Sequence, residues 1–267
     1  MLSKRFQQQK QISGQGFRYR GLDPSRLENL TDAVFAFSIT LLVIASEVPK
    51  TFLELQASMY SFIGFIFCIM LLLGLWNNHS NFFMHYGMRD TFTKMLNFPF
   101  LFLLLFYIYP LKYLFSYVGT GIYVKIKLLL GDNSEALRMA VAEIQQSNMN
   151  EAQWQDLTIR FGLGLFFLYL LLCIMHVNAL KKREALDLNA LEIYETRTFI
   201  QAYALLCMVP ALSMLTVLVL GGGYSDVAGF VYLLVPILLP LHGKFRRSRR
   251  AKVLQSSPAA SPVSSDN

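Results

Sequence analysis

The segment from Arg26 to Pro49 joins a polar start to a long apolar run. An arginine, a glutamate and an aspartate (Asp32) lie within its first seven residues, and the apolar part carries two hydroxyls, Ser38 and Thr40. The charged groups could pair with one another or with a neighbouring helix, because isolated charges are costly in a membrane. A hydroxyl oxygen on a helix face could instead contact a passing cation. The charged residues could therefore hold helices together, and the hydroxyls could contact ions.

Helical spacing groups the apolar residues of this segment into one stripe. Residues at i, i+4 and i+7 share a helix face, which places Phe37, Leu41 and Ile44 together. Thr40 lies at the edge of that stripe, whereas Ser38 lies farther round the helix. Two interpretations of Thr40 stay open. Its hydroxyl could bond back to the carbonyl four residues earlier, or it could face a pore.

A second polar group follows from the next apolar segment. Trp76 and His79 are three residues apart, on one face and at the end that meets the start of the first segment. Arg26 and Asp32 lie at that same end, and an arginine stacked on a tryptophan ring contributes roughly 0.5–2 kcal/mol. We expect the four residues to form a structural clasp between two helices. A part in a permeation path is the alternative.

Catalytic and metal-binding patterns are absent from the sequence. It has no P-loop, no HExxH, no GxSxG and no TVGYG potassium-filter motif. The histidines lie at no i, i+4 spacing that would pair them on one helix, and a lone histidine such as His176 more often hydrogen-bonds to a neighbour. We therefore expect no enzyme activity, no cofactor, no bound metal and no nucleic-acid partner. Transport or conduction is favoured.

Composition places the chain in a membrane. Of its 267 residues 54% are hydrophobic and only 15% are charged, against about 25% charged in a typical soluble domain. About 20 apolar residues cross a bilayer as a helix. The sequence predicts an all-α integral membrane protein with six crossings and no re-entrant pore loop, the spans being about residues 30–48, 58–77, 95–117, 159–180, 198–220 and 227–243.

The basic residues predict the orientation. Most of the 24 Lys and Arg residues fall on one side if both termini are cytoplasmic. This divides the chain into a cytoplasmic segment 1–25, a membrane domain 26–245 and a tail 246–267, basic and then disordered, whose cations could contact anionic lipid head groups. The outer loop 118–158 is the long one. Within it, Leu137, Val141 and Ile144 predict a short amphipathic helix.

The first half of the chain resembles a known family, the transmembrane protein 175 potassium channels. The family motif is an arginine, three variable residues, then Phe-Ser-Asp and an alanine-rich apolar run. Arg26 and Asp32 match it, whereas Leu30 and Thr31 replace Phe and Ser. The Trp76 and His79 pair is similar to the family's second helix. The segment from Leu96 to Pro110, with Asn97, is similar to its third.

The resemblance implies a prokaryotic channel: a homotetramer in the inner membrane that conducts K⁺ through a pore lined by the first helix. The family's narrowest ring, isoleucine or leucine, corresponds to Phe37 here, with Leu41 and Ile44 as the next apolar rings. Thr40 corresponds to the filter hydroxyl, which would transiently contact a partly hydrated K⁺. Four Phe37 rings could close and dewet the path, or turn their electron-rich faces toward a cation.

Three other functions remain open alternatives. A proton-conducting or weakly selective leak would use His79 or His176 as the titrating group. A non-conducting scaffold would keep the fold and lose the pore. A small-molecule transporter ranks last, because the sequence has no detectable inverted repeat and no charged site at mid-membrane.

Overall fold

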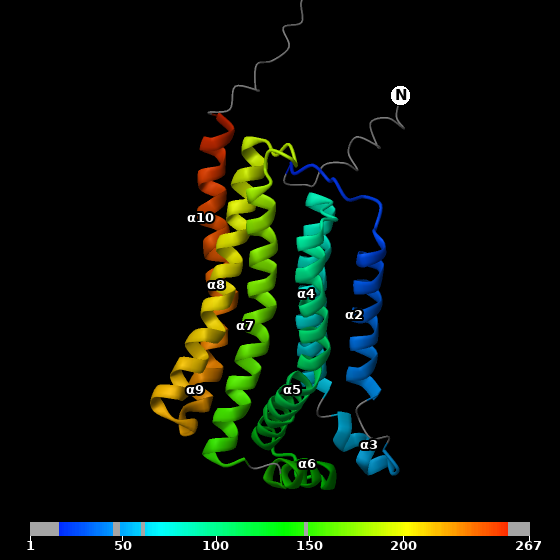
Figure 1. Ribbon diagram of the computed structural model, residues 1–267. Coiled ribbons are helices and arrows are strands. Elements are labelled where there is room, and N and C mark those ends of the chain that lie inside the picture. The colour runs from blue at the N-terminus through cyan, green and yellow to red at the C-terminus, as the bar shows by residue number, and fades with distance from the viewer. Residues whose placement is uncertain (1–15, 45–48, 60–61, 147–148, 256–267) are drawn as a thin grey trace, which may run out of the picture.

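The computed structural model describes residues 16–44, 49–59, 62–146 and 149–255, and these ranges contain helices and no β-strand. Long helices run alongside one another (Figure 1). They are α2 (Arg26–Ile44), α4 (Phe62–Tyr86), α5 (Thr91–Leu129), α7 (Glu151–Lys181), α8 (Ala190–Leu220) and α10 (Val235–Gln255). The short elements are α3 (Phe52–Ser58), α6 (Glu135–Gln146), η2 (Gly222–Tyr224), α9 (Ser225–Phe230) and η3 (Val231–Leu234).

Five segments of the described chain are long and apolar enough to cross a membrane. They are Phe62–Tyr86, Thr91–Leu129, Glu151–Lys181, Ala190–Leu220 and Gly222–Arg250. The helix α2 is not among them. The predicted first span, 30–48, ends in residues 45–48, outside the described part.

The bundle consists of two groups of helices. In one group α4 packs on α5, and α2 lies against both; in the other α7 packs on α8, and α10 lies along α8. Contacts of α5 and α4 with α7 join the two groups. The core is apolar and includes the fully buried side chains Leu72, Leu75, Phe82, Phe100, Leu104, Leu111, Leu168 and Leu172. The helix α2 is therefore covered on one side only.

Helix starts lie earlier than the hydropathy pattern predicted, because polar caps extend the helices. Ser25 Oγ accepts from the Glu28 N–H at 3.3 Å and Glu28 Oε1 accepts from the Ser25 N–H at 2.8 Å, a capping box that starts α2 at Arg26 rather than at residue 30. Equivalent boxes start α7 at Glu151 instead of residue 159 and α8 at Ala190 instead of residue 198.

The helices that contain two of the predicted spans extend beyond them. The second, 58–77, starts at the last residue of α3, and most of it is α4, which begins at Phe62. The helix α4 continues to Tyr86, because polar and aromatic residues past Asn77, such as His79 and Tyr86, are buried in the bundle. The third, 95–117, is α5 and runs from Thr91 to Leu129 with Pro99 and Pro110 inside it.

The sixth predicted span, 227–243, begins in α9 and passes through η3 into α10. The tail predicted from residue 246 is helical as far as Gln255. Two arginines hold this part of α10 on α8: Arg246 Nε donates to Thr198 Oγ1 at 2.9 Å and its Nη2 to the Tyr194 carbonyl at 3.2 Å, and Arg250 pairs with Glu195. The part predicted as disordered, 256–267, lies outside the described residues.

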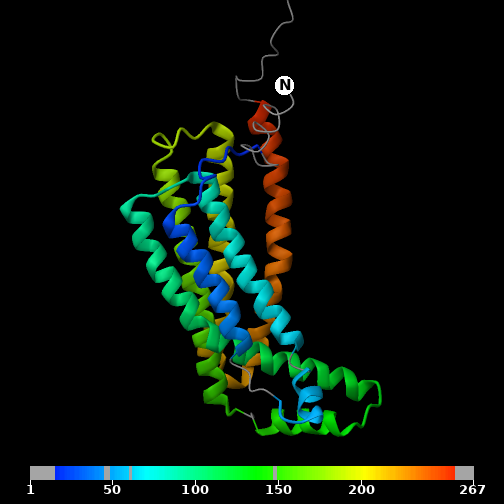
Figure 2. The ribbon, with the colours of Figure 1, turned by 90° about the vertical axis from the view of Figure 1, so that its right-hand side faces the viewer.

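The outer loop predicted over 118–158 is largely helical. Figure 2 shows the last turns of α5 leaving the bundle, with α6 running back beside them and α3 next to α6. Val124, Leu137 and Ala140 are buried there, and Leu53, Val141 and Ile144 pack against them. The predicted amphipathic helix is thus present as α6. It closes a second, smaller core.

Candidate functional site

The helix α2 has two faces of opposite character. Thr31, Phe35, Ser38 and Leu42 are buried against the bundle, and Phe35 contacts the His79 and Phe100 rings of α4 and α5. The other face carries Asn29, Leu30, Ala33, Ala36, Phe37, Thr40 and Val43, all exposed within the subunit. A helix face without intramolecular contacts must meet lipid, another subunit or a pore.

The structure places Phe37 and Thr40 together on this exposed face. The Phe37 side chain is 55% exposed, and no ring of the described residues contacts it. Leu41 is different, because it is half-buried and packs against the core. The side chain of Ile44, the third predicted ring, lies outside the described part of the structure. The exposed face is therefore rotated slightly around the helix axis relative to the predicted stripe. Thr40 lies nearer its centre, and Leu41 lies at its border.

The two hydroxyls of α2 both bond back to their own helix. Thr40 Oγ1 donates to the Ala36 carbonyl at 2.9 Å, and Ser38 Oγ donates to the Val34 carbonyl at 2.7 Å. Ser38 is buried. For Thr40 the bond consumes the hydroxyl proton only, so the oxygen lone pairs remain available on the exposed face. This oxygen has the chemistry of a weak, neutral ligand for an alkali cation.

The polar residues at the start of α2 form two links rather than one cluster. Trp76 Nε1 donates to Asp32 Oδ1 at 2.8 Å, which joins α4 to α2. His79 Nε2 lies 2.6 Å from Asn97 Oδ1, and Asn97 Nδ2 donates to Thr31 Oγ1 at 3.0 Å, which joins α4, α5 and α2. Thr31 thus supplies the hydroxyl that the family motif has as serine.

Arg26 takes no part in these links. Its side chain is exposed, and within the described residues it forms no hydrogen bond, ion pair or ring contact. The stacking of Arg26 on Trp76 is therefore not found within one subunit.

His176 lies among aromatic rings in the core. It is 2% exposed, its Nδ1 lies 2.8 Å from the Leu172 carbonyl, and its ring is near those of Phe82, Tyr86 and Tyr203. No carboxylate is within hydrogen-bonding distance of it in the described chain. The described residues also contain no group of three His, Cys, Asp or Glu side chains that could hold a metal ion.

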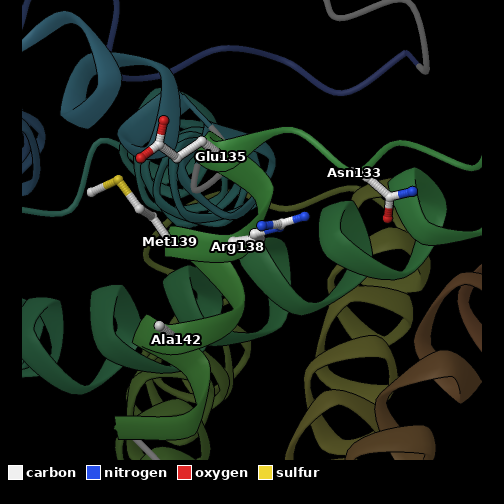
Figure 3. Close-up of a pocket in the computed structure, with 5 residues that line it drawn as sticks. All are labelled: Asn133, Glu135, Arg138, Met139 and Ala142. Atoms are coloured by element: carbon white, nitrogen blue, oxygen red, sulfur yellow. The ribbon is translucent and has the colours of Figure 1, made fainter.

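Sequence reasoning missed a buried ionic group. Arg18 and Arg20, just before α2, both bind Glu192 in the first turn of α8. The pattern Asn189-x-x-Glu192 indicates a helix cap but does not indicate distant arginine partners. A hollow of about 510 Å³ lies elsewhere, on the outer side of α6, lined by Asn133, Glu135, Arg138, Met139 and Ala142 (Figure 3). None of the predicted site residues lines it.

Comparison with known proteins gives three findings. A sequence model of the family described as endosomal/lysosomal potassium channel TMEM175 matches residues 26–107. A protein of Marivirga tractuosa named potassium channel is 37% identical over 246 residues, which covers 90% of this chain and 94% of that protein. The crystal structure of a threonine-to-alanine variant of the potassium channel MtTMEM175, in complex with a nanobody-MBP fusion protein, matches with a TM-score of 0.73 at 34% identity, covering 89% of this chain and 99% of that one.

The matches coincide with the site. The family-matched range contains the whole of α2 and α4 and the part of α5 that holds Asn97. Identity above 30% over nine tenths of the chain extends the relationship to α7, α8 and α10. The chain is thus a multi-pass membrane protein and not an enzyme, and it belongs to the TMEM175 family of potassium channels.

Proposed function

We propose that this protein is a homotetrameric channel that prefers K⁺, with a pore lined by the exposed face of α2. The observation that carries the proposal is the pairing of Phe37 and Thr40 on a face that no other part of the subunit covers. The same face has small residues, Ala33 and Ala36, which would allow four copies of the helix to approach one axis closely.

Other exposed faces of the bundle have a different composition. On α5 the exposed residues include Phe98, Phe102 and Phe106, and on α8 they include Met208, Leu212 and Leu215. Such continuous large apolar side chains suit lipid tails. The α2 face, with Asn29 and Thr40 among its exposed residues, suits water and ions better. This difference in composition favours α2 as the pore helix.

In the proposed pore, four Phe37 side chains form the narrowest ring and four Thr40 oxygens face the ion beside it. Leu41 lies at the border of the face, where the next α2 would contact it, and Ile44 would continue the apolar path. K⁺ loses part of its hydration at Thr40 in exchange for neutral oxygens, which is the source of the preference over Na⁺. No cofactor is required.

We also propose six crossings with both termini in the cytoplasm of a prokaryote, α2 being the crossing that the described residues contain in part. The first described residues and the end of α10 lie at one end of the bundle (Figure 1), and the basic residues of that end support this orientation. On α10, Arg246 and Arg250 contact α8. The exposed cations Lys244, Arg247 and Arg249 would meet anionic head groups.

The test is ion flux into liposomes that contain the purified protein. The wild type is expected to pass K⁺ faster than Na⁺, and Phe37→Ala to raise the K⁺ flux at least about threefold by widening and wetting the constriction. Phe102→Ala is the matched control, since Phe102 is an exposed phenylalanine on α5. Folded tetramers without K⁺ flux would contradict the proposal. A proton flux that disappears when His79 or His176 is replaced would favour the leak instead.

A further inference from the structure

The segment directly before α2 is bound to three other elements. Residues 16–24, here called the strap, cross the end of the bundle from α8 to α2 (Figure 1). The Arg20 and Gly21 N–H groups both donate to the Met84 carbonyl of α4, at 3.0 and 3.1 Å. Gly21 is so close to α4 that a Cβ there would lie 2.3 Å from the Phe83 carbonyl oxygen. The strap therefore packs on α4 through its backbone.

Glu192 is the centre of the strap's side-chain contacts. Its side chain has 0% exposure, and both carboxylate oxygens accept hydrogen bonds. From Arg18, the backbone N–H, Nε and Nη2 donate at 3.0, 3.0 and 2.9 Å. From Arg20, Nη1 and Nη2 donate at 3.2 and 2.7 Å. A buried carboxylate with two guanidinium partners and a full set of donors is a geometrically specific anchor.

The same arginines also fix the connection between α7 and α8. Arg20 Nε donates to the Leu186 carbonyl at 2.9 Å and its Nη2 to the Asp187 carbonyl at 3.1 Å. Arg18 pairs with the Asp187 carboxylate at 3.2 Å and also bonds to the Asp187 carbonyl. The strap thus joins α4, α8 and the α7–α8 connection at one point.

Only Ser25 separates the strap from α2, and Ser25 is the residue that caps α2. The Asp23 carbonyl accepts from Arg89 at 2.5 Å, which holds this junction against the connection between α4 and α5. A change in the tilt of α2 at this end would therefore have to move the strap and strain the contacts of Glu192. The remaining ties of α2, at Thr31 and Asp32, lie one to two turns farther along the helix.

We infer that Arg18, Arg20 and Glu192 are positioning residues that hold the near end of the pore helix and so set how long the channel stays in its most stable state. The inference rests on the proposed function, because it takes α2 as the pore helix. Arg18 and Arg20 lie before the first residue of α2, whereas Phe37 and Thr40 lie three to four turns into it. The anchor should therefore act on gating and leave the permeation path unchanged.

The test is single-channel recording of Arg18→Gln/Arg20→Gln tetramers in lipid bilayers. The mean dwell time in the longest-lived state of the wild type is expected to shorten about fivefold. The single-channel current and the K⁺/Na⁺ permeability ratio are expected to stay at wild-type values. A merely structural role would lower the yield of folded tetramers without changing the dwell times of those that form. Arg160→Gln, which breaks an exposed ion pair on α7, is the matched control.

A second variant loosens the strap without touching a charge. Gly21→Ala places a Cβ against the Phe83 carbonyl and should shorten the same dwell time. Dwell times within twofold of wild type in both variants would overturn the inference. If the wild type conducts no K⁺, the channel proposal fails separately. The anchor is then tested by hydrogen exchange of the backbone amides of residues 26–32. Both variants should accelerate this exchange. Unchanged exchange rates in both variants would overturn the inference.

Discussion

Thr40 is the residue that would give the proposed pore its preference for K⁺. Its hydroxyl proton is bound by the Ala36 carbonyl, so that the group can act toward solvent only through its oxygen. A cation can use such an oxygen, whereas an anion cannot. The hydrogen bond to Ala36 is therefore compatible with the proposed role of Thr40, because it leaves the oxygen lone pairs free.

Thr40→Val tests this role because it keeps the shape of the side chain and removes the oxygen. The K⁺/Na⁺ permeability ratio, measured from reversal potentials with K⁺ on one side and Na⁺ on the other, should fall by about three- to tenfold. Thr216→Val is the control, because Thr216 is partly exposed and also bonds back to the carbonyl four residues earlier, at 2.9 Å on α8. A ratio unchanged in Thr40→Val would exclude Thr40 from selectivity.

Asp90 gives a residue-level prediction of pH dependence. Partial burial raises its pKa, but hydrogen bonds from Lys182 at 2.8 Å and from Thr93 outweigh that effect, so the pKa lies below its usual value. A lowered pKa in the folded state contributes stability that is complete above the unfolded pKa of about 3.9 and is lost as the pH falls through the folded pKa. Both partners are partly exposed, so the contribution is below about 1 kcal/mol.

Asp90→Asn should therefore lower stability slightly near pH 7, and its difference from wild type should shrink as the pH falls below about 4. Thermal unfolding of the detergent-solubilised protein across that pH range measures the difference. Asp156→Asn, which removes the carboxylate of the more exposed ion pair with Arg160 on α7, serves as the comparison. A difference that is constant with pH would mean that the ion pair contributes nothing.

Among the helices, α4 and α5 approach each other closely through glycine. The helices α4 and α5 meet at Gly64 and Gly119, where a Cβ on Gly64 would lie 1.9 Å from the Phe115 carbonyl oxygen and one on Gly119 would lie 2.4 Å from the Gly64 nitrogen. Close approach through glycine is the way in which membrane helices gain packing without a hydrophobic driving force. This contact places α4 and α5 as the support on which α2 lies.

Gly64→Ala should force the two helices apart and cost about 1–3 kcal/mol of stability. Gly74→Ala in the same helix is the matched control, since a Cβ there meets nothing within 4 Å. The control is expected to be neutral or to stabilise by up to about 1 kcal/mol through helix propensity. The melting temperatures of the two variants in detergent distinguish them. Equal melting temperatures would show that the α4–α5 contact can relax freely.

The elements also show what the sequence can and cannot predict. Helical spacing is sufficient to place Phe37 and Thr40 on one side of α2. It joins Trp76 and His79 into one cluster, but residues three apart differ by about 60° around a helix. That angle is enough for Trp76 to reach Asp32 at the edge of α2 while His79 points inward to Asn97. Hydropathy misses the ends of α4 and α5, because it does not register polar side chains that become buried.

The strap illustrates the limit of sequence reasoning for the whole chain. Arg18 and Glu192 are 174 positions apart, and no local pattern predicts such a pair. In the sequence, the basic residues before α2 indicate only orientation. The folded chain uses two of them, Arg18 and Arg20, to neutralise the buried carboxylate of Glu192. Counting basic residues along the sequence cannot reveal such a partner.

In the whole molecule, one subunit covers α2 on one side only. The proposed pore therefore needs several copies of α2 around one axis. Phe37→Cys in a background without Cys68, Cys173 and Cys207 tests this arrangement. Four thiols near one axis should form disulfide-linked dimers under mild oxidation, because disulfides require Cβ atoms about 3.5–4.5 Å apart. Phe102→Cys, on the exposed side of α5 that the proposal places toward lipid, should stay monomeric on the same gel. The native mass should be four times the 30.5 kDa chain. Cross-linking at Phe102 but not at Phe37 would place α5, and not α2, at the axis.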